Sequence, residues 1–135
     1  MAITRFINPP TMSKPIGFAH VVDITGPGRT IYIAGQLGID TDGKVAGSLR
    51  EQIAQAFENV REALSAVGAG FKDIVKLNVF VADRDDYRAG LKPLGRIFRD
   101  YFGDYYPAMA LFEVSKFYQD DALIEMEGFA VIQEP

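Results

Sequence analysis

An amphipathic helix in the middle of the chain is the feature that most restricts its fold. Ser48 and Glu51 have the spacing of a capping box, in which each side chain accepts a hydrogen bond from the backbone N–H of the other residue. Apolar side chains then recur every three or four residues, at Leu49, Ile53, Phe57, Val60, Leu64 and Val67. Gly68 is placed to end the helix at its C′ position. Such a helix must bury its apolar stripe against another layer of structure.

The flanking segments are typical of β-strands and supply that layer. We predict strands over residues 18–24, 30–35, 73–82, 108–114 and 122–132, with a short extra strand over 4–7 as an option. The first two of the five are expected to form a hairpin around the Gly26–Gly28 turn. A second helix is expected over 85–102, kinked or split in two by Pro93. This order predicts an α+β domain with both helices on one face of a mostly antiparallel sheet.

Composition and charge exclude several classes of protein. The 135 residues are 48% hydrophobic, which is enough for one globular domain spanning 1–135, and the chain has no cysteine for a disulfide or a thiolate. Its 14 Lys and Arg residues are scattered among 18 Asp and Glu residues, and this pattern argues against a nucleic-acid partner. The sequence contains no signal peptide and no apolar run of membrane-spanning length. We therefore expect a soluble, cytoplasmic protein with no membrane partner.

The sheet face away from the helices is the second informative feature. Strand alternation assigns to this face Met109, Leu111, Glu113, Leu123, Glu125, Glu127, Phe129 and Val131, with Phe80, Tyr32, Phe18 and His20 as further candidates. The set mixes large apolar side chains with carboxylates, and a monomer would expose it. A homo-oligomer that buries this face is the simplest solution.

Several segments of the sequence resemble the reactive intermediate deaminase (Rid, or YjgF) family. They are PIGFAHVV, IYIAGQLGID, the helix with QAFENV, the strand DIVKLNVFVAD, and the closing YPAMALFEV and LIEMEGFAVI, which follow one another between residues 15 and 132. The resemblance implies a chorismate-mutase-like fold and a homotrimer whose sheets line a central barrel, with ligand clefts between subunits. It also implies hydrolysis of enamine or imine metabolites to 2-keto acids and ammonia, with no metal or organic cofactor.

The resemblance identifies Glu125, in the family's I-E-x-E motif, as the candidate catalytic residue. Its counterpart positions or activates the attacking water, and a carboxylate in a half-apolar cleft should have the raised pKa that suits proton transfer. A structural carboxylate paired across a subunit interface is the equally weighted alternative. The Gly35–Gln36 backbone is expected to line the cleft, and Glu113 is a further candidate at its rim, although a solvated position is the simpler interpretation.

Other positions depart from the family pattern. The arginine that clamps the substrate carboxylate in deaminating members is replaced by Met109, the tyrosine by Phe18 and the glutamine by His20, while Ala34 stands where serine is common. Losing a charged partner for an anionic substrate costs about 2 to 5 kcal/mol. Lys116, Lys76 and His20 are the nearest candidate replacements by strand position.

Two functional hypotheses follow from the resemblance and its departures. The first is a trimeric deaminase acting on a substrate larger than 2-aminoacrylate, or less dependent on a carboxylate clamp, such as an aminomuconate-type enamine. The second is a trimer that binds a small metabolite or a partner protein without catalysis, as the missing arginine, tyrosine and serine would predict. Ribonuclease activity, attached to some family members, is the weakest alternative because the chain is acidic and has a single histidine.

Overall fold

The computed structural model describes residues 3–133, so two positions at each end of the predicted 1–135 domain lie outside the described residues. The capped helix is present as α1 (Leu49–Ser65). The Ser48 hydroxyl accepts a hydrogen bond from the Glu51 N–H at 3.1 Å, and the Glu51 carboxylate accepts one from the Ser48 N–H at 3.3 Å. Gly68 has a φ of 75°, and the next N–H donates back to the Leu64 carbonyl at 2.9 Å. These bonds confirm the predicted glycine-terminated end of the helix.

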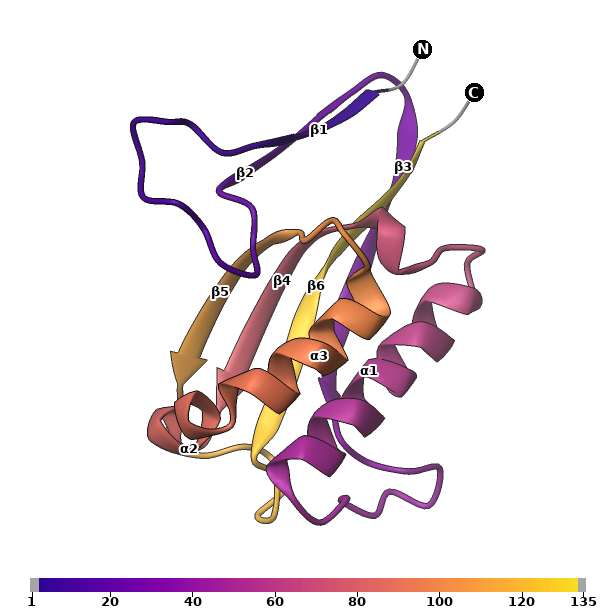
Figure 1. Ribbon diagram of the computed structural model, residues 1–135. Helices are drawn as coiled ribbons and strands as arrows, with labels where there is room; N and C mark the ends of the chain where they lie inside the picture. The colour runs from indigo at the N-terminus through magenta and orange to yellow at the C-terminus, as the bar shows by residue number, and fades with distance from the viewer. Residues whose placement is uncertain (1–2, 134–135) are drawn as a thin grey trace.

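The main sheet has four strands in the order β3-β6-β4-β5 (Figure 1). Their bounds are Gly28–Leu37 for β3, Ile124–Gln133 for β6, Ile74–Val81 for β4 and Ala108–Glu113 for β5. β6 pairs antiparallel with both β3 and β4, whereas β4 and β5 run parallel. The sheet therefore mixes the two pairings, with β3 and β5 at its edges.

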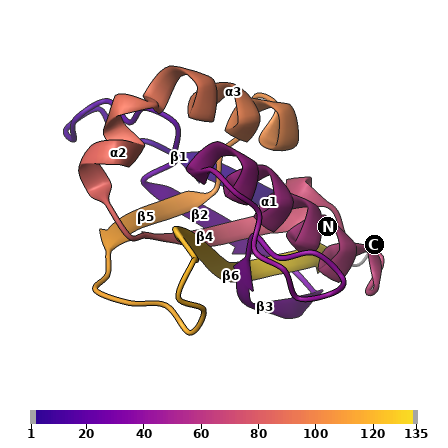
Figure 2. The same cartoon turned by 90° about the horizontal axis from the view of Figure 1, so that it is seen from below.

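The second predicted helix is divided into α2 (Arg84–Ala89) and α3 (Leu91–Phe102). The break falls at Gly90 rather than at Pro93, because Pro93 lies in the first turn of α3, where a missing N–H removes no intrahelical bond. A short 3₁₀ turn, η1 (Phe71–Asp73), leads into β4. Figure 2 shows the α-helices on one face of the sheet and none on the other, as predicted.

The predicted hairpin between residues 18–24 and 30–35 is wrong. β2 (Val21–Thr25) pairs antiparallel with β1 (Ile3–Ile7) in a separate two-stranded sheet, and β3 pairs with β6 instead. The Gly-Pro-Gly turn reverses the chain but does not specify which strand pairs with which. The loop between β1 and β2 reaches back to β5, where the Ala19 N–H donates to the Pro107 carbonyl at 3.0 Å.

The core fills the space between the helices and the main sheet. Phe57 of α1 is fully buried and contacts Phe98 edge-on and Tyr101 face-on, with ring centroids 4.9 and 4.7 Å away. Alternate residues of β6, such as Ile124 and Met126, are fully buried beneath these rings. Because β6 shows its predicted alternation, Glu125 and Glu127 fall on the helix-free face.

The orientation of β5 is opposite to the predicted one. Its register aligns Met109 with Leu77 and Glu113 with Val81, so Met109, Leu111 and Glu113 face the helices. Phe112 instead lies on the open face. The segment AMALFEV is apolar in both phases of the alternation, so apolar character alone could not choose between them. Pairing with β4 fixes the phase.

The helix-free face carries large exposed side chains, as the sequence predicted. Tyr32 is 77% exposed and Phe112 49%, and Phe129 is also exposed. The rings of Tyr32 and Phe129 meet edge-on at 5.1 Å, and those of Phe80 and Phe112 stack at 5.8 Å. The open face of the sheet therefore presents a group of exposed aromatic side chains.

Candidate functional site

Glu125 lies against a bulge in the edge strand β3. Ile33 pairs with Gly128 and Gln36 with Met126, so two β3 residues stand opposite one β6 residue. A Cβ added to Gly35 would lie 2.9 Å from the Glu125 carboxylate carbon and closer still to Oε2. The bulge and the missing side chain at Gly35 therefore make room for this carboxylate, and the structure brings these two predicted site residues together.

The surroundings of the Glu125 carboxylate favour its protonation. Partial burial raises its pKa above the ordinary value for glutamate, and the nearby Glu127 carboxylate raises it further. Within residues 3–133 the Glu125 side chain makes no hydrogen bond or salt bridge that would oppose this shift. A carboxylate with a raised pKa and no partner is suited to accept and return a proton.

Gln52 of α1 positions the start of β6 and was missed from the sequence. It is 1% exposed, and its amide nitrogen donates to the carbonyls of Gly47 at 3.3 Å and Asp121 at 3.1 Å. Its amide oxygen accepts a hydrogen bond from the Leu123 N–H at 2.7 Å. The available signal was its position, three residues after Leu49 and four before Ala56, which places a polar side chain next to the apolar stripe of the helix.

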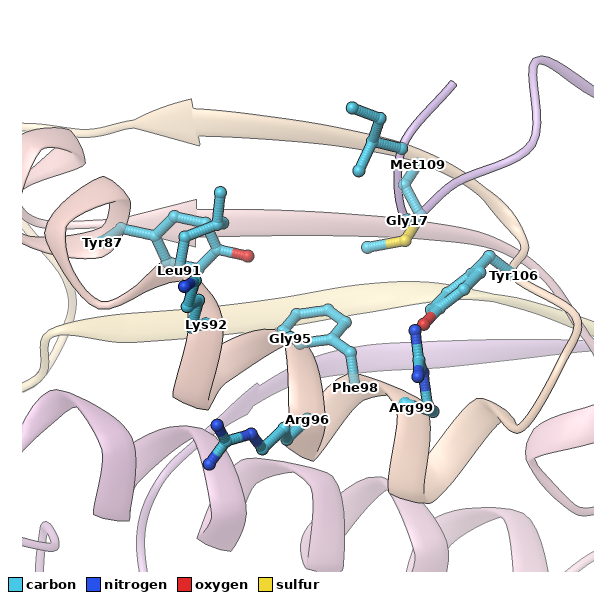
Figure 3. A pocket seen from close by; sticks show the side chains of 11 residues that line it. Gly17, Tyr87, Leu91, Lys92, Gly95, Arg96, Phe98, Arg99, Tyr106 and Met109 are labelled. Atoms are coloured by element: carbon cyan, nitrogen blue, oxygen red, sulfur yellow. The ribbon is translucent and has the colours of Figure 1, made fainter. Parts of the chain in front are cut away.

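Met109 lies on the other side of the sheet, in a pocket of about 490 Å³ between β5, α2 and α3 (Figure 3). Phe98 and Leu91 of α3 provide further apolar walls, and the phenol groups of Tyr87 and Tyr106 also line the space. Burial raises the pKa of Tyr87, so its hydroxyl stays a neutral hydrogen-bond donor at physiological pH. The pocket combines apolar walls with a few polar groups, as ligand sites do.

The rim of this pocket is cationic. Lys92, Arg96 and Arg99 of α3 line it, and none of its eleven lining residues is a carboxylate. In the part of the chain that the structure describes, none of the three makes a salt bridge. Strand position alone could not identify these cations, because they come from the helix that covers β5.

The other candidate cations lie elsewhere. Lys76 is on the helix-free face, since its register partners are Ala108 and Phe129, and Lys116 is exposed in the loop after β5. The His20 ring is within 2.7 Å of the Ser13 carbonyl through Nε2, so it packs within the β1–β2 loop.

The remaining predicted residues have structural partners. The Phe18 ring contacts the His20 ring edge-on, with the ring centroids 5.3 Å apart. In the sequence Phe18 directly follows Ile16 and Gly17, which line the pocket. The Glu113 carboxylate accepts a hydrogen bond from the Arg84 N–H at 3.0 Å, at the first residue of α2, so it does not lie beside Glu125. The Gln36 amide donates to the Ala34 carbonyl at 3.2 Å, inside the bulge.

The predicted site residues thus form two groups on opposite faces of one sheet. Glu125 and Gly35 lie on the open side of β6 and β3, while Met109 opens into the pocket beneath α3. A small substrate cannot touch both groups within one subunit, because the sheet separates them. Residues 3–133 contain no group of three or more acidic or histidine side chains arranged for a metal ion, and no helix there is long and apolar enough to cross a membrane.

These features define an α+β protein with an apolar, cation-rimmed pocket and, on the far side of the sheet, a half-buried carboxylate with a raised pKa. Residues 12–132 match the family described as Endoribonuclease L-PSP, and the chain belongs to this family, which is the YjgF or Rid family that the sequence resembles.

Relatives and solved structures agree with this assignment. A protein of Dermatophagoides farinae named 2-iminobutanoate/2-iminopropanoate deaminase is 30% identical over 136 residues, covering 98% of this chain and all of its own. The human protein of the same name is 36% identical over 105 residues, covering 76% and 73% of the two chains. The crystal structure of YyfB from Yersinia pestis, a Rid family protein of unknown function, matches with a TM-score of 0.85 and 33% identity over 96% of this chain and 98% of that one.

Proposed function

We propose that this protein is a hydrolytic deaminase of an imine or enamine metabolite, with Glu125 as the catalytic carboxylate. The observation that carries the proposal is the unpartnered Glu125 side chain, held against Gly35 with a raised pKa. Relatives named 2-iminobutanoate/2-iminopropanoate deaminase support the reaction class. The products would be a carbonyl compound and ammonia.

The proposed reaction needs one group that moves protons between water and nitrogen. Water adds to the imine carbon while the Glu125 carboxylate accepts a proton, and the imine nitrogen takes up a proton to give a carbinolamine. A second transfer, from the hydroxyl oxygen to the amine through the same carboxylate, breaks the C–N bond and releases ammonia. An enamine first takes a proton at carbon and loses one from nitrogen to become the imine. A carboxyl group with a pKa nearer neutrality serves each of these transfers.

The site is completed, in this proposal, by a second copy of the chain in a homotrimer. The Glu125 bulge lies at the β3 edge of the sheet and the Met109 pocket at the β5 edge. A closed ring in which the β3 edge of one subunit approaches the β5 edge of the next would bring the two groups into one cleft. The same ring would cover the exposed Tyr32, Phe112 and Phe129 of the open face.

The test is ammonia release by the purified protein from iminopropanoate, from larger imino acids and from an aminomuconate-type enamine. Glu125→Gln keeps the shape of the side chain and removes its ability to accept a proton, so the rate should fall about 100-fold or more. Glu62→Gln is the matched control, because it removes an exposed carboxylate of α1, which lies on the opposite face of the sheet from Glu125. Equal rates for Glu125→Gln and the unmodified protein would contradict the assignment.

A metabolite-binding trimer without catalysis is the second candidate, and Met109 is the observation that favours it. The resemblance places a carboxylate-clamping arginine at this position, and a thioether cannot form an ion pair. If no substrate of the panel releases ammonia above background while one of them raises the melting temperature, this second function replaces the first.

A further inference from the structure

We propose that the Met109 pocket selects a carboxylate with a bulky apolar side chain, and that Arg99 of α3 is the cation that binds its carboxylate. The inference deepens the proposed function by naming a substrate class, and its binding part can be tested without catalysis. It rests on the size, the charge and one unusual glycine of the pocket.

The size of the pocket exceeds the need of a three-carbon imino acid. Its volume of about 490 Å³ is that of sites for metabolites or drug-sized molecules. Phe98, only 5% exposed, and Met109 give it apolar walls, and a flexible thioether adapts well to branched or aromatic groups. A small ligand would leave these walls uncovered, whereas a bulky side chain would displace water from them.

The charge of the pocket selects an anion. The chain has a net charge of −4, yet three cations and no carboxylate line this space. Figure 3 shows the Arg99 side chain directed toward the Tyr106 hydroxyl, with the Arg96 side chain directed away from it. A guanidinium beside a phenol offers several donors to one carboxylate, and an arginine can bind it with two hydrogen bonds. Arg99 on helix α3 therefore binds the ligand carboxylate, which Met109 on strand β5 cannot do.

Gly95 keeps the helix side of the pocket open. It lies inside α3, where glycine is less favourable than alanine. A Cβ added at Gly95 would meet no atom within 4 Å, so no packing constraint requires a glycine there. Since Gly95 lines the pocket, its missing side chain is explained by space for a ligand.

Calorimetric titration of the unmodified oligomer tests the selection with three probes. The probes are 4-methyl-2-oxopentanoate, pyruvate, which lacks the bulky group, and 4-methyl-2-pentanone, which lacks the carboxylate. The first should bind at least about tenfold more tightly than either of the others. Equal affinity for pyruvate would overturn the size selection, and equal affinity for the neutral ketone would overturn the charge selection.

Two matched pairs of variants locate the site. Arg99→Gln should weaken binding of 4-methyl-2-oxopentanoate about tenfold, because one charged hydrogen-bonding partner is lost. Arg88→Gln, an exposed position on α2 outside the pocket, should leave binding unchanged. Gly95→Trp should abolish binding by filling the pocket, while Gly95→Ala, which adds one methyl group to the wall, should weaken binding only slightly and raise the melting temperature. Unchanged affinity in Arg99→Gln or in Gly95→Trp would overturn the inference.

The same variants separate this inference from the proposed function. If the probes bind as expected but no imine releases ammonia, the pocket assignment stands and the deaminase proposal fails. If the imine of 4-methyl-2-oxopentanoate is deaminated equally well by Gly95→Trp and by the unmodified protein, the deaminase proposal stands and the pocket assignment fails.

Discussion

Gly35 decides where the Glu125 carboxylate can sit. A β-bulge widens the strand locally, and the absence of a side chain at this one position leaves space that the glutamate fills. The carboxylate therefore lies against backbone, and within residues 3–133 no cation lowers the pKa that burial and Glu127 raise. The resemblance paired these two residues as site residues, and the structure supplies the physical link between them.

Replacing Gly35 with alanine should impair catalysis more than it impairs folding. The new Cβ would overlap the end of the Glu125 side chain, which is flexible and can move aside at little cost in stability. Displacing a catalytic group by about 1 Å can cost up to about 100-fold in rate, so we expect a loss of tenfold or more in ammonia release. Gly70→Ala is the control, because an added Cβ there meets no atom within 4 Å. A Gly35→Ala variant with full activity would show that the carboxylate position is unimportant.

Met109 is both a packing residue and a pocket residue. Its thioether contacts the core and also forms a wall of the cavity beneath α3. A cation at this position would point into the space that the apolar part of a larger ligand would occupy. In our proposal a cation of the neighbouring helix α3, and not a lysine of the strands, binds the carboxylate of the ligand.

At the scale of elements, Gln52 joins α1 to the strand that carries Glu125. Its buried amide makes three hydrogen bonds, two of them to the segment just before β6. These bonds join helix α1 to the start of strand β6, although the two elements are far apart in the sequence. The bond to Leu123 lies two residues before the proposed catalytic carboxylate, Glu125. The geometry of the site depends on this side chain although it touches no substrate.

Substituting Gln52 with leucine should lower the free energy of unfolding by about 2 to 3 kcal/mol. The change leaves the Leu123 N–H without its partner in a buried setting, and an unpaired buried donor costs about this much. Gln55→Leu is the matched control, since that half-buried side chain makes one hydrogen bond, to Asn59. Chemical denaturation of the two variants measures the difference, and equal stabilities would contradict the role assigned to Gln52.

Local signals explain which elements were predictable from the sequence. Helix α1 was predicted at both ends because its capping box, apolar stripe and terminal glycine all lie within one segment. Which residues of β5 face the helices could not be predicted, because AMALFEV is apolar on both sides. Pairing with the neighbouring strand β4 sets the register. For the same reason Met109 was predicted on the same sheet face as Glu125, whereas the two residues lie on opposite faces. The cations of α3 were missed because their role depends on which helix covers which strand.

At the scale of the whole molecule, the two halves of the proposed site lie on opposite faces of one sheet. One subunit offers a carboxylate on its open face and a pocket under its helices, and the open face also exposes aromatic side chains. The proposed ring would account for both facts, because it would cover the aromatic side chains and join the Glu125 bulge of one copy to the pocket of the next. The central claim is therefore that catalysis needs residues from two subunits.

Complementation between two inactive chains tests that claim most directly. Glu125→Gln lacks the carboxylate, Gly95→Trp lacks the pocket, and each alone should release almost no ammonia from the imine that the unmodified protein turns over best. When the two variants are co-expressed and mix at random, about a quarter of the interfaces between neighbouring subunits should combine an intact Glu125 with an intact pocket. Ammonia release should then return to about a quarter of the rate of the unmodified protein. Activity that stays at the level of the single variants, although mixed oligomers form, would contradict a shared site.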